Sequence, residues 1–518
     1  MLAPSYACDD PDLYLLYVEN YGKKYTEKYI FSIVNNISRA IIKKESFIET
    51  FMPIRLYNTL SRTKEEFVPQ SPGKVGFYAC GPTVYHYAHL GNLRAYVFMD
   101  VLHRVLRYHG YNVNLVVNIT DVGHLTDDAD QGEDKMEKGA AREGKSVWDI
   151  AAHYTAAFME DVKSLNIKQP TTWCKATDHI PQQIKLIKDI EENGFAYQTS
   201  DGVYFDTSKL DDYGKLIAGF DKEGLQAGKR VDMGEKRNAT DFALWKFSPK
   251  NETRQMEWDS PWGRGFPGWH IECTAMGCHY LGEQFDIHTG GIDHIPVHHT
   301  NEIAQAQGAF GRDHVRFWMH NEFLVTDGEK MAKSKGEFLR LASVIEKGFS
   351  ALDYRYFCLL THYRKPLTFT WEAIEAAATA RKRLTQRVAQ LKESAQPAGL
   401  PSAERLEFQK QFAAAVYDDC NTSQALGVVH ELLKSDLSDG EKLALLLDWD
   451  SVLGLKFAAA TIPSTDVPKE VQALVDEREV ARKNKDWAQA DKLRAEIAQR
   501  GFLVSDSEQG PVVSQDNT

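Results

Sequence analysis

The fold is indicated by one stretch near the start of the chain, KVGFYACGPTVYHYAHLGN, residues 74–92. Its apolar run, Val75 to Tyr78, predicts a buried strand, and residues 92–109 carry apolar side chains at helical spacing. Residues 112–119 predict the next strand. A strand, a helix and a second strand in this order favour a parallel α/β sheet.

Later segments extend this sheet and then interrupt it. Residues 285–288 and 315–318 are typical of further strands. The block from about residue 162 to 256 breaks the alternation, and we expect it to form an inserted subdomain. From residue 371 the pattern becomes helical, and a charged helix is predicted over residues 470–500.

The length and composition are typical of a multidomain cytosolic protein. A chain of 518 residues exceeds one ordinary core. Seven irregularly placed cysteines favour free thiols or a metal site over a disulfide framework. The sequence has no apolar run long enough to span a membrane, and its net charge of −12 gives a nucleic-acid partner no support. We expect a cytoplasmic monomer with no membrane partner.

Residues 1–51 differ from the rest of the sequence. They are rich in Tyr and Asn, residues 29–44 could form an amphipathic helix, and several acidic residues argue against a transit peptide. Met52 begins a segment typical of a native start. We expect residues 1–51 to be an extension with no catalytic role.

A candidate metal set consists of Cys80, Cys273, His298 and Glu302. His298 and Glu302 are four residues apart in a run that reads as helix, so both side chains can face one point. Two thiolates, an imidazole and a carboxylate suit Zn²⁺. The spacing is not that of a zinc finger, and free cysteines are more often small buried hydrophobes. Three further histidines stay open as rival ligands: His288, His294 and His299.

Two short segments resemble the HIGH and KMSKS signatures of class I aminoacyl-tRNA synthetases. They are His89-Leu90-Gly91-Asn92 and Lys330-Met331-Ala332-Lys333-Ser334. Either match alone is weak, but the pair occurs in the expected order. In that class the signatures hold ATP while an amino-acid carboxylate attacks its α-phosphate.

Six longer segments resemble the cysteinyl-tRNA synthetase family, and the resemblance extends from about Ile54 to Val513. They are Phe77 to Tyr85, Asn118 to Asp121, Asp241 to Lys246, Trp258 to Gly263, Pro267 to Cys273 and His298 to Glu302. The resemblance implies a Rossmann-like parallel-sheet catalytic domain with an inserted subdomain, followed by a helical anticodon-binding bundle. It also implies one zinc per chain on Cys80, Cys273, His298 and Glu302.

The same resemblance assigns the substrate contacts. Thr120 and Trp269 are expected to border the amino-acid pocket. ATP, with Mg²⁺, is expected at His89, Gly91, Asn92 and Lys333. A separate GGxD turn pattern at residues 290–293, weak by itself, adds Gly291 and Asp293 to the expected ATP contacts. Catalytic roles fall on His89, Lys330 and Lys333, which can stabilise charge on the phosphates. The partners are L-cysteine, ATP and cysteine tRNA, and the product forms through a cysteinyl-adenylate.

The chain departs from the family pattern at several places. Ala332 and Thr300 replace common residues of two signatures, Phe266 stands where the family has Arg, and the stretch from Gly123 to Asp134 is longer than usual. These changes leave the finer substrate contacts open.

We expect residues 52–370 to form the catalytic domain, 371–465 the anticodon-binding bundle and 468–518 a C-terminal helical module with a tail. Asp419 to Thr422 resembles a turn of the family's bundle. One alternative is a zinc-dependent cysteine:amino-sugar ligase of the mycothiol pathway, which would not need the C-terminal helices. The other is a non-catalytic tRNA-binding paralogue, which would be signalled by loss of His89 or of both signature lysines.

Overall fold

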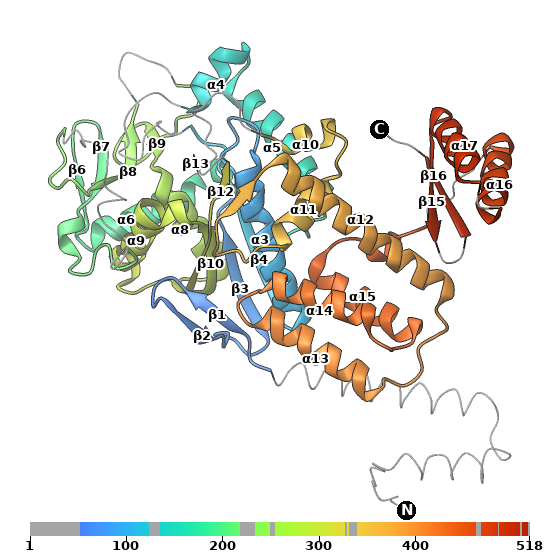
Figure 1. Ribbon diagram of the computed structural model, residues 1–518. Helices are drawn as coiled ribbons and strands as arrows, with labels where there is room; N and C mark the ends of the chain where they lie inside the picture. Colours follow the sequence, from blue (N-terminus) through green and yellow to red (C-terminus); the bar gives the residue numbers. More distant parts are fainter. Residues whose placement is uncertain are drawn as a thin grey trace, which may run out of the picture. The chain divides into compact units, whose positions relative to one another are not determined.

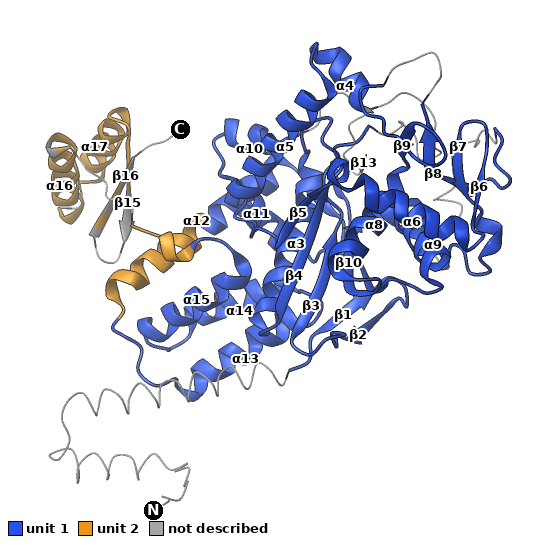
Figure 2. Ribbon diagram, turned by 180° about the vertical axis from the view of Figure 1, so that it is seen from behind, with its two compact units in different colours: residues 1–381, 396–456 blue, residues 382–395, 457–518 orange. Residues whose placement is uncertain are grey.

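The computed structural model describes residues 52–123, 135–217, 234–248, 254–326, 329–330, 339–462, 468–484, 486–507 and 510–515. The expected extension and its helix, most of the stretch from Gly123 to Asp134, and Met331 to Ser334 lie outside these ranges. The chain divides into two compact units, residues 1–381 with 396–456 and residues 382–395 with 457–518 (Figure 2).

A five-stranded parallel sheet forms the centre of the first unit (Figure 1). Its order is β11-β10-β3-β4-β5, and each neighbouring pair is parallel. The strands are β3 (Lys74–Ala79), β4 (Asn112–Ile119), β5 (Thr172–Lys175), β10 (Phe285–Gly291) and β11 (Val315–Asn321). The four strands predicted from the sequence are confirmed, and the α/β class with them.

The strand order reverses between β3 and β10. The chain lays down β3, β4 and β5 toward one side, then adds β10 and β11 on the other side of β3. In open parallel sheets, ligands bind in the crevice that such a reversal leaves outside the carboxyl ends of the strands. That crevice lies between Cys80, which follows β3, and the end of β10.

Helices connect the strands of this sheet. The predicted helix is confirmed as α3 (Leu90–Tyr108), which leads from β3 to β4. α8 (Trp269–Leu281) precedes β10, and α9 (Thr300–Phe310) leads to β11. Apolar side chains from the sheet and from these helices form one buried cluster that includes Tyr78, Val116, Met276, Ile303 and Trp318.

The range expected as an insert, about 162–256, contains part of a second sheet. This antiparallel sheet has the order β6-β7-β8-β9, with α6 (Ile180–Glu192) before it. Its strands are β6 (Ala196–Gln198), β7 (Gly202–Phe205), β8 (Phe242–Phe247) and β9 (Gly265–Pro267). The same range also holds β5, which pairs with β4 in the central sheet.

The remaining elements of the first unit flank the central sheet or follow it. They are β1 (Arg55–Asn58), β2 (Thr63–Glu66), α4 (Lys135–Glu143), α5 (Val147–Ser164), β12 (Leu324–Thr326), β13 (Glu329–Lys330), α10 (Leu341–Glu346), α11 (Ala351–Leu359), β14 (Leu367–Phe369), α13 (Ala403–Tyr417), α14 (Thr422–Lys434) and α15 (Asp439–Leu453). α12 (Trp371–Ser394) begins in the first unit and ends in the second.

The second unit corrects one prediction. The single charged helix expected over residues 470–500 is two helices, α16 (Lys469–Lys483) and α17 (Trp487–Gln499). A second helix begins here because the Asp486 carboxylate accepts a hydrogen bond from the Gln489 N–H at 3.1 Å and thereby caps the start of α17. A hairpin that the sequence did not predict follows, β15 (Phe502–Ser507) with β16 (Gly510–Gln515).

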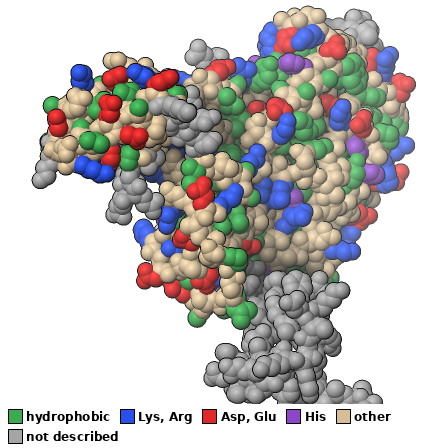
Figure 3. Space-filling model, turned by 90° about the vertical axis from the view of Figure 1, so that its right-hand side faces the viewer, with side chains coloured by type: hydrophobic (Ala, Val, Ile, Leu, Met, Phe, Trp, Pro, Cys, Tyr) green, Lys and Arg blue, Asp and Glu red, His purple; other side chains and the backbone are tan. Residues whose placement is uncertain are grey.

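Two further features concern the charges on the surface and the apolar character of the helices. Acidic and basic side chains are interspersed on the face shown in Figure 3 rather than gathered by sign. None of the helices in the described ranges combines the length and the apolar character that a bilayer crossing requires.

Candidate active site

A cavity of about 310 Å³ lies at the carboxyl ends of β3, β4 and β10. Eleven of the residues singled out from the sequence line it: Cys80, His89, Gly91, Asn92, Thr120, Trp269, Cys273, Gly291, Asp293, His294 and His298. Small-molecule sites have volumes of this order. Residues that precede the expected insert and residues that follow it therefore meet at the crevice of the strand reversal.

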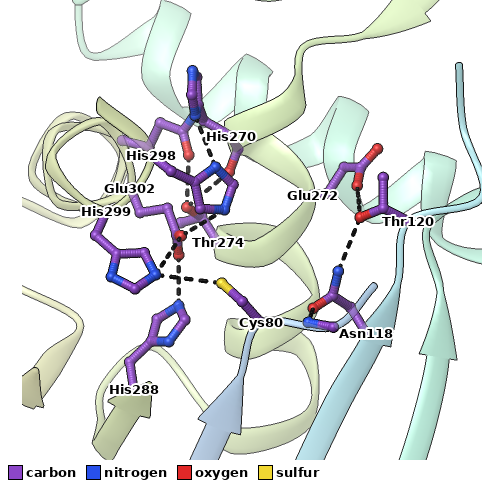
Figure 4. Close-up of polar contacts among 12 residues, drawn as sticks. Cys80, Asn118, Thr120, His270, Glu272, Thr274, His288, His298, His299 and Glu302 are labelled. Atoms are coloured by element: carbon purple, nitrogen blue, oxygen red, sulfur yellow. Dashed lines mark hydrogen bonds and ion pairs between the residues drawn. The ribbon is translucent and has the colours of Figure 1, made fainter. Parts of the chain in front are cut away.

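The predicted metal ligands come together in the structure. Cys80 follows β3, Cys273 lies one turn into α8, and His298 lies in the π-helical turn η4 (Ile295–His299) that leads into α9. Glu302 is in the first turn of α9. One ligand atom from each of the four residues lies within 4.8 Å of the other three. Figure 4 shows Cys80, His298 and Glu302 converging from separate elements.

A rival set shares two members with the first. Cys80, His288, His299 and Glu302 also bring their ligand atoms within 4.8 Å of one another. Nε2 of His288 lies 3.0 Å from Oε2 of Glu302, and Nε2 of His299 lies 3.3 Å from Sγ of Cys80. The opposite nitrogen of His299 is 2.7 Å from Nε2 of His320.

Access to the cavity separates the two sets. Cys80, Cys273 and His298 line the cavity, whereas His288 and His299 are fully buried and are absent from its lining. A cation held by the first set would face a ligand in the cavity. A cation held by the second set would lie behind Cys80.

The buried carboxylate of Glu302 fits a cation. Its side chain is 0% exposed, and Oε1 lies 3.1 Å from Nε2 of His298. Within the described part of the chain, however, that oxygen receives no hydrogen bond. A buried carboxylate oxygen that accepts no hydrogen bond carries a large desolvation cost, which a metal ion would offset.

The two thiols have opposite acidities. Burial disfavours the Cys80 thiolate, but a hydrogen bond from Cys273 and the nearby His299 and His294 rings bring the pKa of Cys80 well below its usual value. The hydrogen bond to Cys80, together with burial, raises the pKa of Cys273 well above its usual value. One buried thiolate is thus already favoured, and thiolates are the form that binds metals.

A chain of hydrogen bonds fixes the wall beside the thiols. The Thr120 hydroxyl donates to Oε2 of Glu272 at 2.9 Å and accepts from Nδ2 of Asn118 at 3.0 Å (Figure 4). Oδ1 of Asn118 accepts from the Gly81 N–H at 2.7 Å. The segment after Cys80 is thereby tied to the end of β4. A Cβ atom at Gly81 would lie 1.5 Å from the Asn118 carbonyl oxygen, so only glycine fits.

Trp269 forms a second wall, next to the metal set. It is the first residue of α8, and its ring centroid lies 4.3 Å from that of His298 with 35° between the planes. Behind His298, its Nδ1 is 3.0 Å from Nδ1 of His270. These contacts hold the His298 ring between the cavity and the interior.

His89 caps the helix that borders the cavity. Nδ1 of His89 accepts a hydrogen bond from the Asn92 N–H at 3.1 Å, and the Asn92 side chain accepts from the His89 N–H at 3.2 Å. A ring that accepts at Nδ1 carries its proton on Nε2. The Asn92 N–H is engaged in this cap, so an ATP contact by Asn92 stays a prediction.

The second signature is only partly described. Lys330 lies in β13, which pairs with β12, and β12 pairs in turn with β14. Its side chain and Lys333 lie outside the described residues. Gly291 and Asp293 line the cavity at the end of β10, as the weak GGxD pattern suggests.

Sequence reasoning missed three residues of the site: Asn118, His270 and Glu272. All three stand inside segments that carry the family resemblance, beside residues that were assigned roles. Glu272 and His270 lie on α8 with Trp269 and Cys273, and they contact Thr120 and His298 respectively. The signal in the sequence was a polar residue inside each matching segment, and the structure shows that all three are 0–1% exposed.

Comparisons with known proteins agree with this geometry. The model of the tRNA synthetases class I (C) catalytic domain matches residues 66–379. The model of the cysteinyl-tRNA ligase anticodon binding domain matches residues 464–511, which is the C-terminal module rather than the bundle at 371–465.

Curated relatives match almost end to end. Cysteine–tRNA ligase 1 of Burkholderia lata is 53% identical over 89% of this chain and 96% of its own length. Cysteine–tRNA ligase of Treponema denticola is 48% identical over 88% of this chain and 98% of its own.

A solved structure shares the fold. Methionyl-tRNA synthetase of Mycobacterium tuberculosis, in complex with methionyl-adenylate, superposes with a TM-score of 0.52 at 16% identity. The match covers 76% of this chain and 92% of that one. By the family model, the identities and the coverage, the chain belongs to the cysteine–tRNA ligase family of class I aminoacyl-tRNA synthetases.

Proposed function

We propose that this protein attaches L-cysteine to cysteine tRNA at the expense of ATP, through a cysteinyl-adenylate. The observation that carries the proposal is the convergence of Cys80, Cys273, His298 and Glu302 at the wall of a cavity that the HIGH-like segment also borders. A thiol-binding centre and a nucleotide signature in one cavity fit an enzyme that activates cysteine.

Zn²⁺ is the proposed metal, one per chain, on Cys80, Cys273, His298 and Glu302. The donors are those of a tetrahedral zinc site, and three of them face the cavity. Bound there, zinc would favour a soft thiolate over a hydroxyl, a difference in kind that shape alone does not provide. The rival set with His288 and His299 is less suited because neither ring lines the cavity.

The pocket residues bind and orient the amino acid. Thr120 and Trp269 form two walls next to the thiols, and Glu272 holds the Thr120 hydroxyl in place. The fixed walls limit the space beside the metal set. We propose that they select a side chain of the size of cysteine and present its carboxylate toward ATP.

His89 and the signature lysines act on the phosphates. With its proton on Nε2, His89 can donate a hydrogen bond to a phosphate oxygen, and the start of α3 adds the positive end of the helix dipole. Lys330 and Lys333 are proposed to neutralise charge that develops during adenylate formation. ATP with its Mg²⁺ is proposed to lie over Gly91, Gly291 and Asp293.

The chain's division follows from this assignment. We propose a catalytic domain over residues 52–370 with its insert at about 162–256, a helical bundle at 371–465 and a C-terminal module at 468–518. The anticodon-binding match at 464–511 supports tRNA recognition by that module. A cytoplasmic monomer and a non-catalytic extension at residues 1–51 complete the proposal.

The same match argues against the amino-sugar ligase, because such an enzyme has no use for an anticodon-binding domain. His89 and both signature lysines are retained, which argues against a non-catalytic paralogue. The deciding assay is charging of cysteine tRNA with radiolabelled cysteine in the presence of ATP. Product on the tRNA supports the proposal, whereas coupling of cysteine to an amino sugar with none to tRNA would replace it.

A further inference from the structure

A buried arginine lies two residues beyond the end of the first signature. Arg94 lies on α3 and is 3% exposed. Its Nη1 donates to the carbonyl oxygen of Glu322 at 2.8 Å and also to that of Phe323. Its Nη2 donates to the carbonyl oxygens of Lys365 at 2.5 Å and Tyr363 at 3.4 Å.

Backbone carbonyls are the hydrogen-bond acceptors of this guanidinium, and it forms no ion pair with a carboxylate in the described ranges. Burial accordingly lowers the pKa of Arg94 from its ordinary value. Four acceptors on two chain segments match the planar, forked donors of an arginine. The contact is therefore one of shape as much as of charge.

Both segments lead into strands of the small sheet β13-β12-β14, in which β13 contains Lys330. Glu322 and Phe323 line the cavity and directly precede β12, and β12 pairs with β13 at Lys330. Residues 363–365 precede β14, which pairs with the other side of β12. Arg94 thus holds the entrances of two adjacent strands of that small sheet.

The start of α3 also contacts this sheet directly. A Cβ atom at Gly91 would lie 3.7 Å from Cβ of Leu324, so the helix and β12 meet closely here. Arg94 and the first turn of α3 therefore act on the same strand.

We propose that Arg94 is a positioning residue that sets the spacing between the HIGH-like helix end and the strand pair bearing Lys330. The inference rests on the proposed function, because those two elements enclose the nucleotide. Arg94 acts through the Glu322–Phe323 wall, whereas the metal set is held by the end of β3 and by α8, η4 and α9. A loss of Arg94 should change ATP use and leave cysteine recognition in place.

The test is cysteine-dependent ATP–pyrophosphate exchange on the full chain, with KM measured separately for ATP and for cysteine. Arg94→Lys keeps the positive charge but loses the fork, and Arg94→Gln keeps two amide donors without charge. The matched control is Arg104→Lys, the same change on the same helix. Arg104 is 5% exposed and bonds to the carbonyls of Ser451 and Asn166 and to Asp100, away from the cavity.

We expect both Arg94 variants to lose roughly tenfold to a hundredfold in kcat/KM for ATP, since small misplacements of reacting groups cost that much. Zinc content and KM for cysteine should stay within about twofold of wild type, because cysteine binding does not depend on the contacts that position ATP. Arg104→Lys should lower the melting temperature without this split between substrates.

Two results would overturn the inference. One is a kcat/KM for ATP in Arg94→Lys and Arg94→Gln equal to that of Arg104→Lys. The other is a rise in KM for cysteine as large as the rise in KM for ATP. Absence of exchange in the wild-type protein would instead contradict the proposed function. The two failures are therefore distinguishable.

Discussion

Nε2 of His298 lies 3.1 Å from Oε1 of Glu302, and that carboxylate oxygen receives no hydrogen bond from the rest of the described structure. The two residues are a turn apart, where η4 passes into α9. The wide π turn and the following helix direct both side chains toward Cys80. This pair is the strongest indication in the site that a cation binds there.

Removal of a thiolate should remove the metal and the chemistry together. Cys273→Ala is expected to drop zinc from about one per chain to a small fraction, with loss of cysteine activation. Elemental analysis and pyrophosphate exchange on one preparation measure both. The control is Thr300→Val, which loses only the hydrogen bond to the Ile295 carbonyl at 2.7 Å and should keep its zinc. Full zinc occupancy after replacement of both Cys80 and Cys273 would refute the site.

The two histidine sets predict opposite results for neighbouring variants. His298→Gln should lose zinc and cysteine activation, because His298 faces the cavity in the proposed set. His299→Gln should keep most of its zinc and lose the contact to His320. Zinc retained by the first variant and lost by the second would assign the metal to His288 and His299.

His89 combines a capping role with a proposed catalytic one, and two variants separate them. Asparagine is a good N-cap, so His89→Asn should keep the stability of α3 while losing the Nε2 donor. Its kcat for pyrophosphate exchange should fall about a hundredfold, the effect of losing one transition-state donor. His89→Ala should lose the same activity and about 1 kcal/mol of stability besides. Undiminished activity in His89→Asn would reduce His89 to a helix cap.

Truncation after Lys456 should separate activation from tRNA charging. The cut removes the two helices and the hairpin of the second unit and leaves the cavity, the metal set and α13 to α15 intact. Pyrophosphate exchange should stay near the wild-type rate, and KM for tRNA should rise strongly. An earlier cut after Leu367 would remove most of β14, the partner of β12, so it is a poorer test. Normal charging by the truncated chain would move tRNA recognition into the catalytic domain.

One buried histidine gives the fold a pH dependence away from the metal site. Burial lowers the pKa of His103 to about 4, below its usual value near 6.5. The unfolded chain therefore takes up this proton first, and stability falls as the pH drops from about 6.5 to 4. Between pH 7 and 5 this amounts to about 2 kcal/mol. Urea unfolding at both pH values should show that His103→Gln loses this part of the slope, and an unchanged slope would contradict the assignment.

Hydrophobic patterns in the sequence predicted four strands of the central sheet and α3, because each of these elements has apolar side chains at the spacing of its type. The strand pairs and the place where their order reverses depend on contacts between distant segments, which periodicity does not contain. The break at Asp486 was missed because a charged helix and two capped helices have nearly the same composition.

The metal set was predictable because all four ligands stand in segments that resemble the family. The competing arrangement of His288 and His299 became visible only when their distances to Glu302 and Cys80 were known. Arg94 gave no signal in the sequence, because its partners are backbone carbonyls, which any residue supplies.

The most direct test is pyrophosphate exchange by the zinc-loaded full chain with cysteine, serine or alanine as the amino acid. We expect exchange that depends on cysteine, with rates for serine and alanine lower by more than about a thousandfold, since the metal distinguishes sulfur from oxygen and carbon. Exchange of similar rate with serine, or exchange that proceeds without cysteine, would contradict the claim that the Cys80, Cys273, His298 and Glu302 centre selects the substrate.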